Sequence, residues 1–272
     1  MPGHVGAVLS LQRAAGNAAV TRALAAGGHG LTVQRARPHP GSLTNNVREQ
    51  PGSRLFGPSE EDQRKLEKAF PKEGDTYQQF PNPVKSGLRA HLGLPQPAEW
   101  VKLINSHRDE KGMEFLANCV EAVRSFLASW SGNPTAAAGV DQSVKRDDGG
   151  PMREDDGPGR TSAWLNTRWR DDLTEDDADP NKAWGVVADR LRRAGHGASA
   201  IVVFEHSRAS HAVAGVNYQG AVIWVDAQLA KVHLEKAPWK AVGIVRSITL
   251  DSSLLPFEAP EPINTSTLLT LD

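Results

Sequence analysis

The stretch FLANCVEAVRSFLASW, residues 115–130, constrains the fold of this chain most, because its apolar residues recur with the spacing of an α-helix. They form one broad face that must pack against another layer of the protein. Residues 131–134 (SGNP) predict the end of this helix and a turn. The apolar face consists of Phe115, Leu116, Cys119, Val120, Val123, Phe126, Leu127 and Trp130.

Cys119, the only cysteine of the chain, lies near the start of this predicted helix. Asn118, directly before it, is a candidate N-cap. A thiol at this position feels the positive end of the helix dipole, which favours the thiolate and makes the sulfur more nucleophilic. Taken alone, however, a single cysteine on an apolar helix face is more typical of a protein core than of an active site.

The composition excludes several classes of protein. A chain of 272 residues can hold one large domain, or one domain with an appendage. Its net charge of −1 gives no overall basic field, so neither nucleic acid nor a membrane surface is an expected partner. The single cysteine rules out an internal disulfide framework. No apolar run reaches the ~18–20 residues of a transmembrane helix, and no conventional secretory signal is expected at the N-terminus.

We predict four parts along the chain. Residues 1–35 are rich in Ala and Val but too poor in large apolar residues to build a core alone. Residues 36–58, rich in Pro, Gly, Ser and Asn, have the composition of a linker. The predicted catalytic domain spans residues 59–250, and its acidic stretch 141–182 is expected to be a long exposed loop or insertion with a helical turn around residues 162–169. Residues 251–272, with three prolines, form the predicted C-terminal extension.

A short string in the first part, LQRAAGNAAV at residues 11–20, is distinctive. It resembles the LQR-x-x-GN-x-x-V segments near the N-termini of actinobacterial proteins linked to extracellular contractile injection systems and polymorphic toxins. The resemblance implies a delivery or loading role for residues 1–35. It also implies an injection or secretion apparatus as a partner, and a protein made in the bacterial cytoplasm that acts in a target cell.

Helical patterns come first in the chain and strand patterns follow. Helices are expected from Ser59, an N-cap followed by acidic residues, and again over residues 97–105, 115–130 and 183–194. Alternating or β-branched runs then predict strands at 200–204, 211–218, 221–226 and 243–250. This order is typical of an α+β fold and not of alternating β-α-β units.

The second and third predicted strands carry the residues that change the interpretation of Cys119. Gln219 and Gly220 match a two-residue hairpin loop, which would place Tyr218 opposite Ala221, whereas a three-residue loop would change which side chains share a face. Side chains alternate between faces along a strand, so this register puts His211, Val213, Asp226 and Gln228 on one face. His211 and Asp226 would then be diagonal neighbours, about 7–8 Å apart between Cα atoms.

A histidine beside an aspartate is what a cysteine nucleophile needs. The imidazole takes the thiol proton or holds the thiolate, and the carboxylate fixes the orientation of the ring. Together these residues favour a catalytic role for Cys119, His211 and Asp226. No metal site is predicted, because His206 and His233 lack ligand spacing with Cys119 and the acidic pairs of 141–182 lack the spacing of a calcium loop.

Residues from about 105 to 228 resemble the papain-fold toxin glutaminase family, whose members are protein-glutamine deamidases. The matching pieces, in order, are Asn118-Cys119, Gly132-Asn133-Pro134, Ser210-His211-Ala212, Gly220 and Val225-Asp226-Ala227-Gln228. The resemblance implies a papain-like fold in which the nucleophile helix packs on an antiparallel sheet. It implies Cys119 as nucleophile, His211 as general base and acid, and Asp226 as the residue that orients His211. A protein substrate, a cognate immunity protein and no cofactor are implied as well.

The chain departs from papain-like proteases ahead of the cysteine. Those enzymes usually carry a Gln there that donates to the oxyanion, whereas residues 111–118 are KGMEFLAN. We therefore consider the Cys119 backbone N–H and the Asn118 side chain as donors. Gln228 is on the right face to line the substrate slot or to make a structural hydrogen bond.

Three functions are compatible with these residues. The leading one is a glutaminase-type deamidase that converts Gln side chains of a target protein to Glu. A cysteine protease or a transglutaminase-like enzyme would use the same three residues. A non-catalytic cargo or interaction module is the third, and it would be favoured if Cys119 reacted no faster with iodoacetamide than an ordinary thiol.

Overall fold

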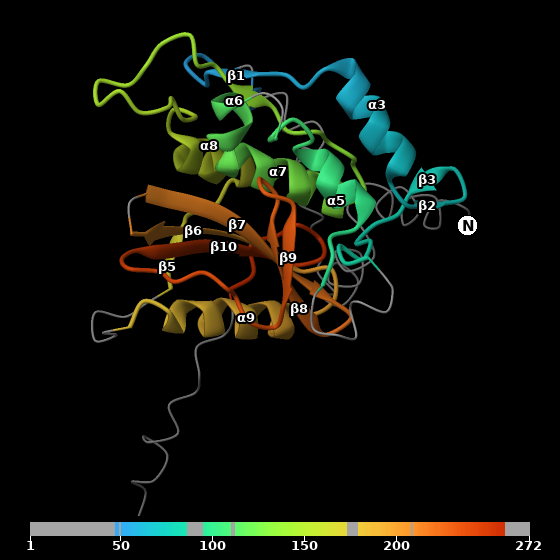
Figure 1. Ribbon diagram of the computed structural model, residues 1–272. Helices are drawn as coiled ribbons and strands as arrows, with labels where there is room; N and C mark the ends of the chain where they lie inside the picture. The colour runs from blue at the N-terminus through green and yellow to red at the C-terminus, as the bar shows by residue number, and fades with distance from the viewer. Residues whose placement is uncertain are drawn as a thin grey trace, which may run out of the picture.

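The computed structural model describes residues 47–48, 50–85, 95–109, 112–172, 179–207 and 209–258. These residues form three layers, with a central sheet covered by helices on both faces (Figure 1). Helix α7 (Cys119–Trp130) lies over one face and helix α9 (Lys182–Ala194) over the other. The described residues contain no helix that is long and apolar enough to cross a membrane. The predicted segment 1–35 and residues 259–272 lie outside the described residues.

The sheet is antiparallel throughout, with the strand order β5-β10-β6-β7-β8-β9. All four predicted strands are present, and the α+β prediction is confirmed. Two short edge strands were not predicted, because neither has an apolar run that marks it in the sequence. The six strands are β5 (Arg170–Asp171), β6 (Ser199–His206), β7 (Ala209–Tyr218), β8 (Ala221–Asp226), β9 (Lys231–Leu234) and β10 (Val245–Leu250).

The hairpin between β7 and β8 has the predicted register. Tyr218 pairs with Ala221, and Ala214 pairs with Val225. Gln219 and Gly220 both have positive φ, at 53° and 93°, which is the conformation of the tight turns that match the twist of paired strands. Because the turn fixes the register, it also fixes which face of the sheet each later side chain occupies.

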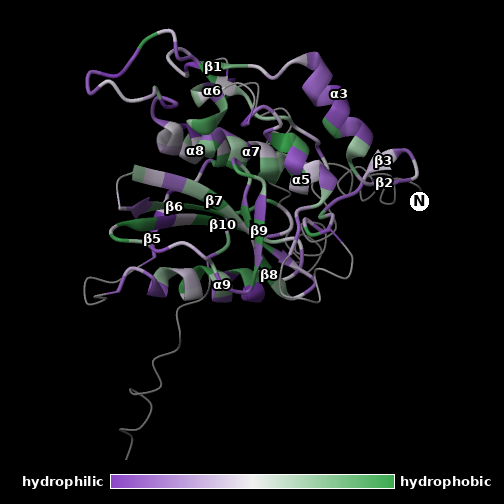
Figure 2. Cartoon of the chain, in the orientation of Figure 1, coloured by the Kyte–Doolittle hydropathy of each residue, from purple (hydrophilic) through white to green (hydrophobic). Residues whose placement is uncertain are grey.

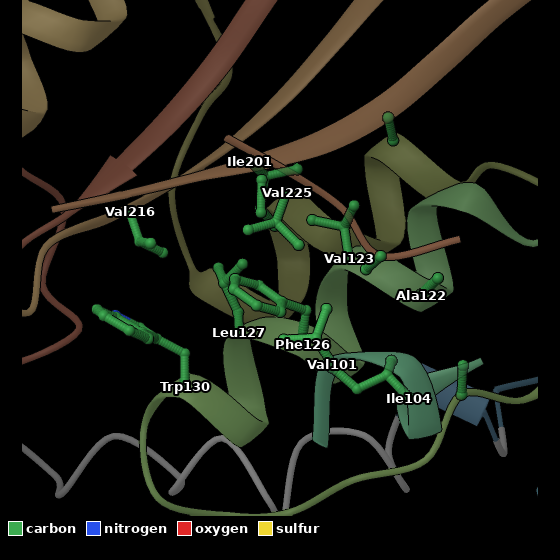
Figure 3. Close-up of a cluster of buried hydrophobic side chains, with 14 of the residues drawn as sticks. Val101, Ile104, Ala122, Val123, Phe126, Leu127, Trp130, Ile201, Val216 and Val225 are labelled. Carbon is green, nitrogen blue, oxygen red and sulfur yellow. The ribbon is translucent and has the colours of Figure 1, made fainter. Parts of the chain in front are cut away.

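Each face of the sheet carries its own hydrophobic core. On one side, α7 buries Val123, Phe126, Leu127 and Trp130 against strand residues that include Val216 and Val225 (Figure 3). On the other side, α9 packs Trp184, Val187 and Leu191 against Val213 and Trp224. Colouring by hydropathy shows the apolar residues gathered on the strands and on the helix surfaces that meet them (Figure 2). The helix carrying Cys119 thus packs against the sheet along its length.

The helices that precede α7 cover its outer side. They are α3 (Glu60–Ala69), α5 (Glu99–Ile104) and α6 (Met113–Leu116). The predicted cap of α3 is confirmed, because the Ser59 side chain accepts from the Asp62 N–H. Short strand pairs join this layer: β1 (Leu55–Phe56) with β4 (Gly139–Val140), and β2 (Lys72–Glu73) with β3 (Thr76–Tyr77).

The single helix predicted over residues 115–130 is divided. Helix α6 ends at Leu116 and α7 begins at Cys119. Asn118 occupies the N-cap position of α7, but its side chain makes no capping hydrogen bond. The Asn118 Oδ1 that could cap the helix instead accepts from the amides of Asn105 and Gln228. The amide nitrogen of Asn118 donates to Asn105 Oδ1 and Ala138 O, and the backbone before the cysteine is non-helical.

Two predicted irregular regions contain ordered structure. The predicted linker 36–58 includes β1 and the buried Val47. The predicted acidic loop 141–182 includes helix α8 (Gly157–Leu165), which packs on α7. This helix overlaps the helical turn expected around residues 162–169 but begins earlier. The stretch is not exposed throughout, because Glu154, just before α8, is buried as the partner of Arg124 on α7. The division of the chain into domains stays a prediction.

Candidate active site

Cys119 is the first residue of α7 and is half-buried at the end of the main core. The first N–H groups of a helix have no intrahelical acceptor, so the Cys119 N–H is available to a bound group. The positive end of the helix dipole lies at the same point. The thiol and a backbone donor are therefore presented together at the start of a helix that is fixed along its whole length.

His211 and Asp226 form a direct hydrogen bond. The distance between His211 Nε2 and Asp226 Oδ2 is 2.9 Å, and the exposed fractions of the side chains are 14% and 1%. The second carboxylate oxygen of Asp226 accepts from the Leu229 N–H at 2.9 Å. Both oxygens are thus held, so the carboxylate can fix the tilt of the imidazole ring.

The thiol of Cys119 is the second partner of His211. Burial lowers the pKa of His211, but hydrogen bonds with Asp226 and Cys119, and the negative charges of both, raise it to about 10. Since Nε2 is bound to Asp226, Nδ1 is the ring nitrogen left for the sulfur. The structure therefore brings the three predicted residues together, with His211 between the other two.

The two further predicted residues, Asn118 and Gln228, are buried beneath this group. The Asn118 amide donates to Ala138 O at 2.8 Å and to Asn105 Oδ1 at 3.0 Å. Both of its hydrogens are therefore used, which argues against the predicted role of this side chain as an oxyanion donor. The Gln228 amide donates to Asn118 Oδ1 at 3.4 Å. Of the two roles predicted for Gln228, this bond matches the structural hydrogen bond. The residue also lines the groove described below.

Asn105 joins these amides to the rest of the site. Its amide donates to Phe115 O and to Gln228 O, each at 2.9 Å, and the residue is 1% exposed. It thereby ties the end of α5, the turn before Cys119 and the end of β8 together. No motif singles out Asn105 in the sequence; its place directly after an apolar helical run is the one available signal.

A buried ion cluster fixes the first turns of α7. Glu121 is fully buried between Arg48, at 2.5 Å, and Arg124, at 2.9 Å. Burial raises the pKa of Glu121, but the two guanidinium groups outweigh it and hold that pKa below its usual range. Arg124 also binds Glu154 at 2.6 Å. With its charges paired, this cluster holds the helix start beside Cys119.

A groove of about 560 Å³ opens next to the imidazole. It lies where β6 and β8 end, where β7 begins and where the chain returns after β9. Its walls are apolar and aromatic with a polar rim: Phe204, His206, Ser207, His211, Asp226, Gln228, Leu229, Trp239, Lys240 and Val242. The described residues include no group of three or more His, Cys, Asp or Glu side chains that could hold a metal ion.

Comparison with known proteins gives one finding. Neither the curated proteins nor the solved structures contain a match to this chain. A family model does match, over residues 117–231, which is less than half of the chain but contains Cys119, His211 and Asp226. The active-site region of this chain is thus similar to the family described as papain fold toxin 1, glutamine deamidase.

Proposed function

We propose that this protein is a toxin-type enzyme that deamidates glutamine side chains of a target protein. One observation carries the proposal: His211 is hydrogen-bonded to Asp226 and lies near enough to Cys119 for the thiol to raise its pKa, and all three lie within the residues that resemble glutamine deamidase toxins. We further infer that the fold is papain-like, because the helix bearing the cysteine packs on an antiparallel sheet bearing the histidine.

The first half of the reaction releases ammonia. Because the pKa of His211 is raised, the imidazole keeps its proton near neutral pH. The reacting form of a cysteine nucleophile is the thiolate, which this imidazolium would pair with. The sulfur adds to the side-chain carbonyl carbon of the bound Gln, forming a C–S bond and an oxyanion. When the carbonyl re-forms, the C–N bond breaks and the nitrogen leaves as ammonia with the proton of His211. A thioester on Cys119 and a neutral imidazole remain.

The second half restores the enzyme. A water molecule gives a proton to the neutral His211 while its oxygen adds to the thioester carbon. The C–S bond then breaks, leaving a Glu side chain on the target and the thiolate–imidazolium pair in the site. Asp226 keeps the ring in one orientation through both halves, because its hydrogen bond to Nε2 is independent of the sulfur side.

The oxyanion needs donors that are already in place. The Cys119 N–H, at the start of α7, is the donor we assign. Asn118 acts on this donor indirectly, since its buried hydrogen bonds hold the backbone that precedes the helix. An oxyanion so placed also meets the positive end of the helix dipole.

The experiment is mass spectrometry of candidate target proteins after incubation with the purified enzyme. Conversion of Gln to Glu, with release of ammonia, is expected with wild type and not with Cys119→Ala. Equal conversion by both proteins would refute the proposal. Peptide fragments would indicate a protease instead, and cross-linked products would indicate a transglutaminase.

We also propose that residues 1–35 direct delivery, on the strength of the LQRAAGNAAV string. In this proposal the protein is made in a bacterial cytoplasm, loaded into an injection or secretion apparatus and released in a target cell. An immunity protein would then protect the producer. A variant lacking residues 1–35 should fail to load while the purified protein keeps its activity, and loss of activity in vitro would contradict this division of roles.

A further inference from the structure

The groove beside His211 has a wall that the deamidation mechanism does not use. His211 and Asp226 line it, and Phe204 and Trp239 are its aromatic lining residues. The rings of Phe204 and Trp239 lie 6.1 Å apart and both contact Trp184, so these walls are anchored in the core under α9. Its volume of about 560 Å³ is within the range of ligand pockets.

The open side of the groove is also apolar. Leu229 and Val242 line it with exposed fractions of 36% and 57%. A second hollow, of about 460 Å³, shares Val242 and continues along the exposed Ile244. Large apolar side chains left in water next to reactive groups are typical of a surface that binds a partner.

The segment that carries these residues is held in place before any partner binds. The Val242 N–H donates to Glu205 O at 2.9 Å, and the Glu205 N–H donates to Ile244 O at 3.0 Å. These bonds continue the pairing of β6 with β10 past the end of the sheet. A preformed wall loses little conformational entropy when a ligand binds, which favours its use in recognition.

We propose that this groove is a specificity pocket that accepts a large apolar side chain of the target protein close to the reacting glutamine. The proposal rests on the proposed function, since it places the substrate's carboxamide between Cys119 and His211. Extended chains advance about 3.3 Å per residue, so a side chain in a groove that touches His211 belongs to a residue within about three positions of the glutamine. Aromatic and long aliphatic side chains match the apolar walls, whereas acidic or small ones leave them in water.

The test uses peptides with a central Gln in which one residue at a time, up to three positions to either side, is Phe, Leu, Ala or Asp. Ammonia release by the full-length protein gives kcat/KM for each peptide. At one position wild type should prefer Phe or Leu over Ala by about tenfold or more. Val242→Asp and Leu229→Asp, which put a charge at the mouth of the groove, should reduce that ratio to near one.

Val186→Asp is the matched control, because Val186 is similarly exposed, at 41%, but lies on α9 away from the groove. It should leave the preference unchanged. Thermal unfolding of each variant separates a local change from a loss of folding. Turnover without any preference in wild type, or a preference that both groove variants retain, would overturn the proposal.

A binding measurement separates this proposal from the proposed function. Calorimetry with Cys119→Ser and the same peptides should show tighter binding of the Phe or Leu peptide than of the Ala peptide, and Val242→Asp should remove the difference. If this binding is seen but wild type releases no ammonia, the deamidase proposal fails and the pocket stands. If neither binding nor kinetics distinguishes the peptides, the pocket proposal fails.

Discussion

The part of the chain that the structure describes contains two histidine–aspartate pairs with nearly the same geometry and different surroundings. His211 Nε2 lies 2.9 Å from Asp226, and His107 Nε2 lies 2.7 Å from Asp62. Both carboxylates are buried, at 1% and 6% exposure. The difference lies in what else each pair meets, because the only thiol of the chain lies near enough to His211 to help raise its pKa.

The pair at Asp62 is built into the helical layer. Asp62 lies in the first turn of α3, and its carboxylate also accepts from the hydroxyls of Ser59, at 2.6 Å, and Ser106, at 3.3 Å. These bonds fasten α3 to the turn that follows α5. The pair at Asp226 lies instead beside the groove and near the start of the nucleophile helix. The comparison teaches that a histidine–aspartate bond alone indicates structure, and that chemistry requires a nucleophile and an open surface next to it.

The largest contrast between the pairs should be in catalysis. Asp226→Asn removes the negative charge that stabilises the imidazolium, so kcat/KM for glutamine deamidation should fall by about a hundredfold to ten-thousandfold. Asp62→Asn, the same substitution in the other pair, should leave kcat/KM nearly unchanged. Ammonia release from a Gln-containing peptide measures both. Equal losses in the two variants would mean that the Asp226 pair is structural too.

The pH profile should separate the pairs next. The hydrogen bond and charge of Asp226 help raise the pKa of His211 to about 10, and the mechanism needs this proton for the leaving ammonia. The rate should therefore fall as pH rises through about 10, where His211 loses the proton. In Asp226→Asn the fall should move to lower pH, toward the ordinary value of His near 6.5. If the fall in rate at high pH is unchanged in Asp226→Asn, that fall belongs to the titration of another group. Asp62→Asn is the control and should keep the wild-type pH profile.

The Asp226 pair could be predicted from the sequence because local rules fix it. Alternation along two strands and one tight turn at Gln219-Gly220 determine the register, and the structure has that register. The helix that ends at Trp130 follows from periodicity in the same way. The expected α+β order of elements follows from patterns that each lie within one segment.

The supporting contacts could not be predicted, because they join residues far apart in the chain. Asn105 bonds to Gln228, and Arg48 bonds to Glu121. The partners are so far apart in sequence that no periodic pattern of residues indicates that they meet. The break between α6 and α7 has the same origin: Asn118 gives its amide to Asn105 and Ala138, while the apolar pattern runs on unbroken. For the same reason the Asp62 pair was not predicted at all.

A smaller effect should separate the network under the active site from the pair at Asp62. Asn105→Ala removes the donor to Phe115 O and Gln228 O, which costs about 1–3 kcal/mol of stability for buried groups left unpaired. It should also lower kcat more than it raises KM, because the Cys119 helix and the Asp226 loop lose their common tie. Ser106→Ala, in the adjacent residue, removes a bond to Asp62 and should alter stability alone. A kcat unchanged by Asn105→Ala at a temperature where the variant is folded would leave Asn105 a purely structural role.

The smallest expected effect is the acid dependence of stability at Asp62. Burial raises the pKa of Asp62. Hydrogen bonds from Ser59, His107 and Ser106, together with the charge of His107, lower this pKa by more, so that the net pKa lies below 3.8. The stabilisation from the ionised group is therefore complete above the unfolded pKa of about 3.8 and is lost as pH falls through the lower folded value. Asp62→Asn should cost about 1–2 kcal/mol near neutral pH, and this difference from wild type should shrink below pH 3.8. Urea unfolding at a series of pH values measures it, and a difference that stays constant into acid would show that the ionised form of Asp62 contributes nothing to holding α3.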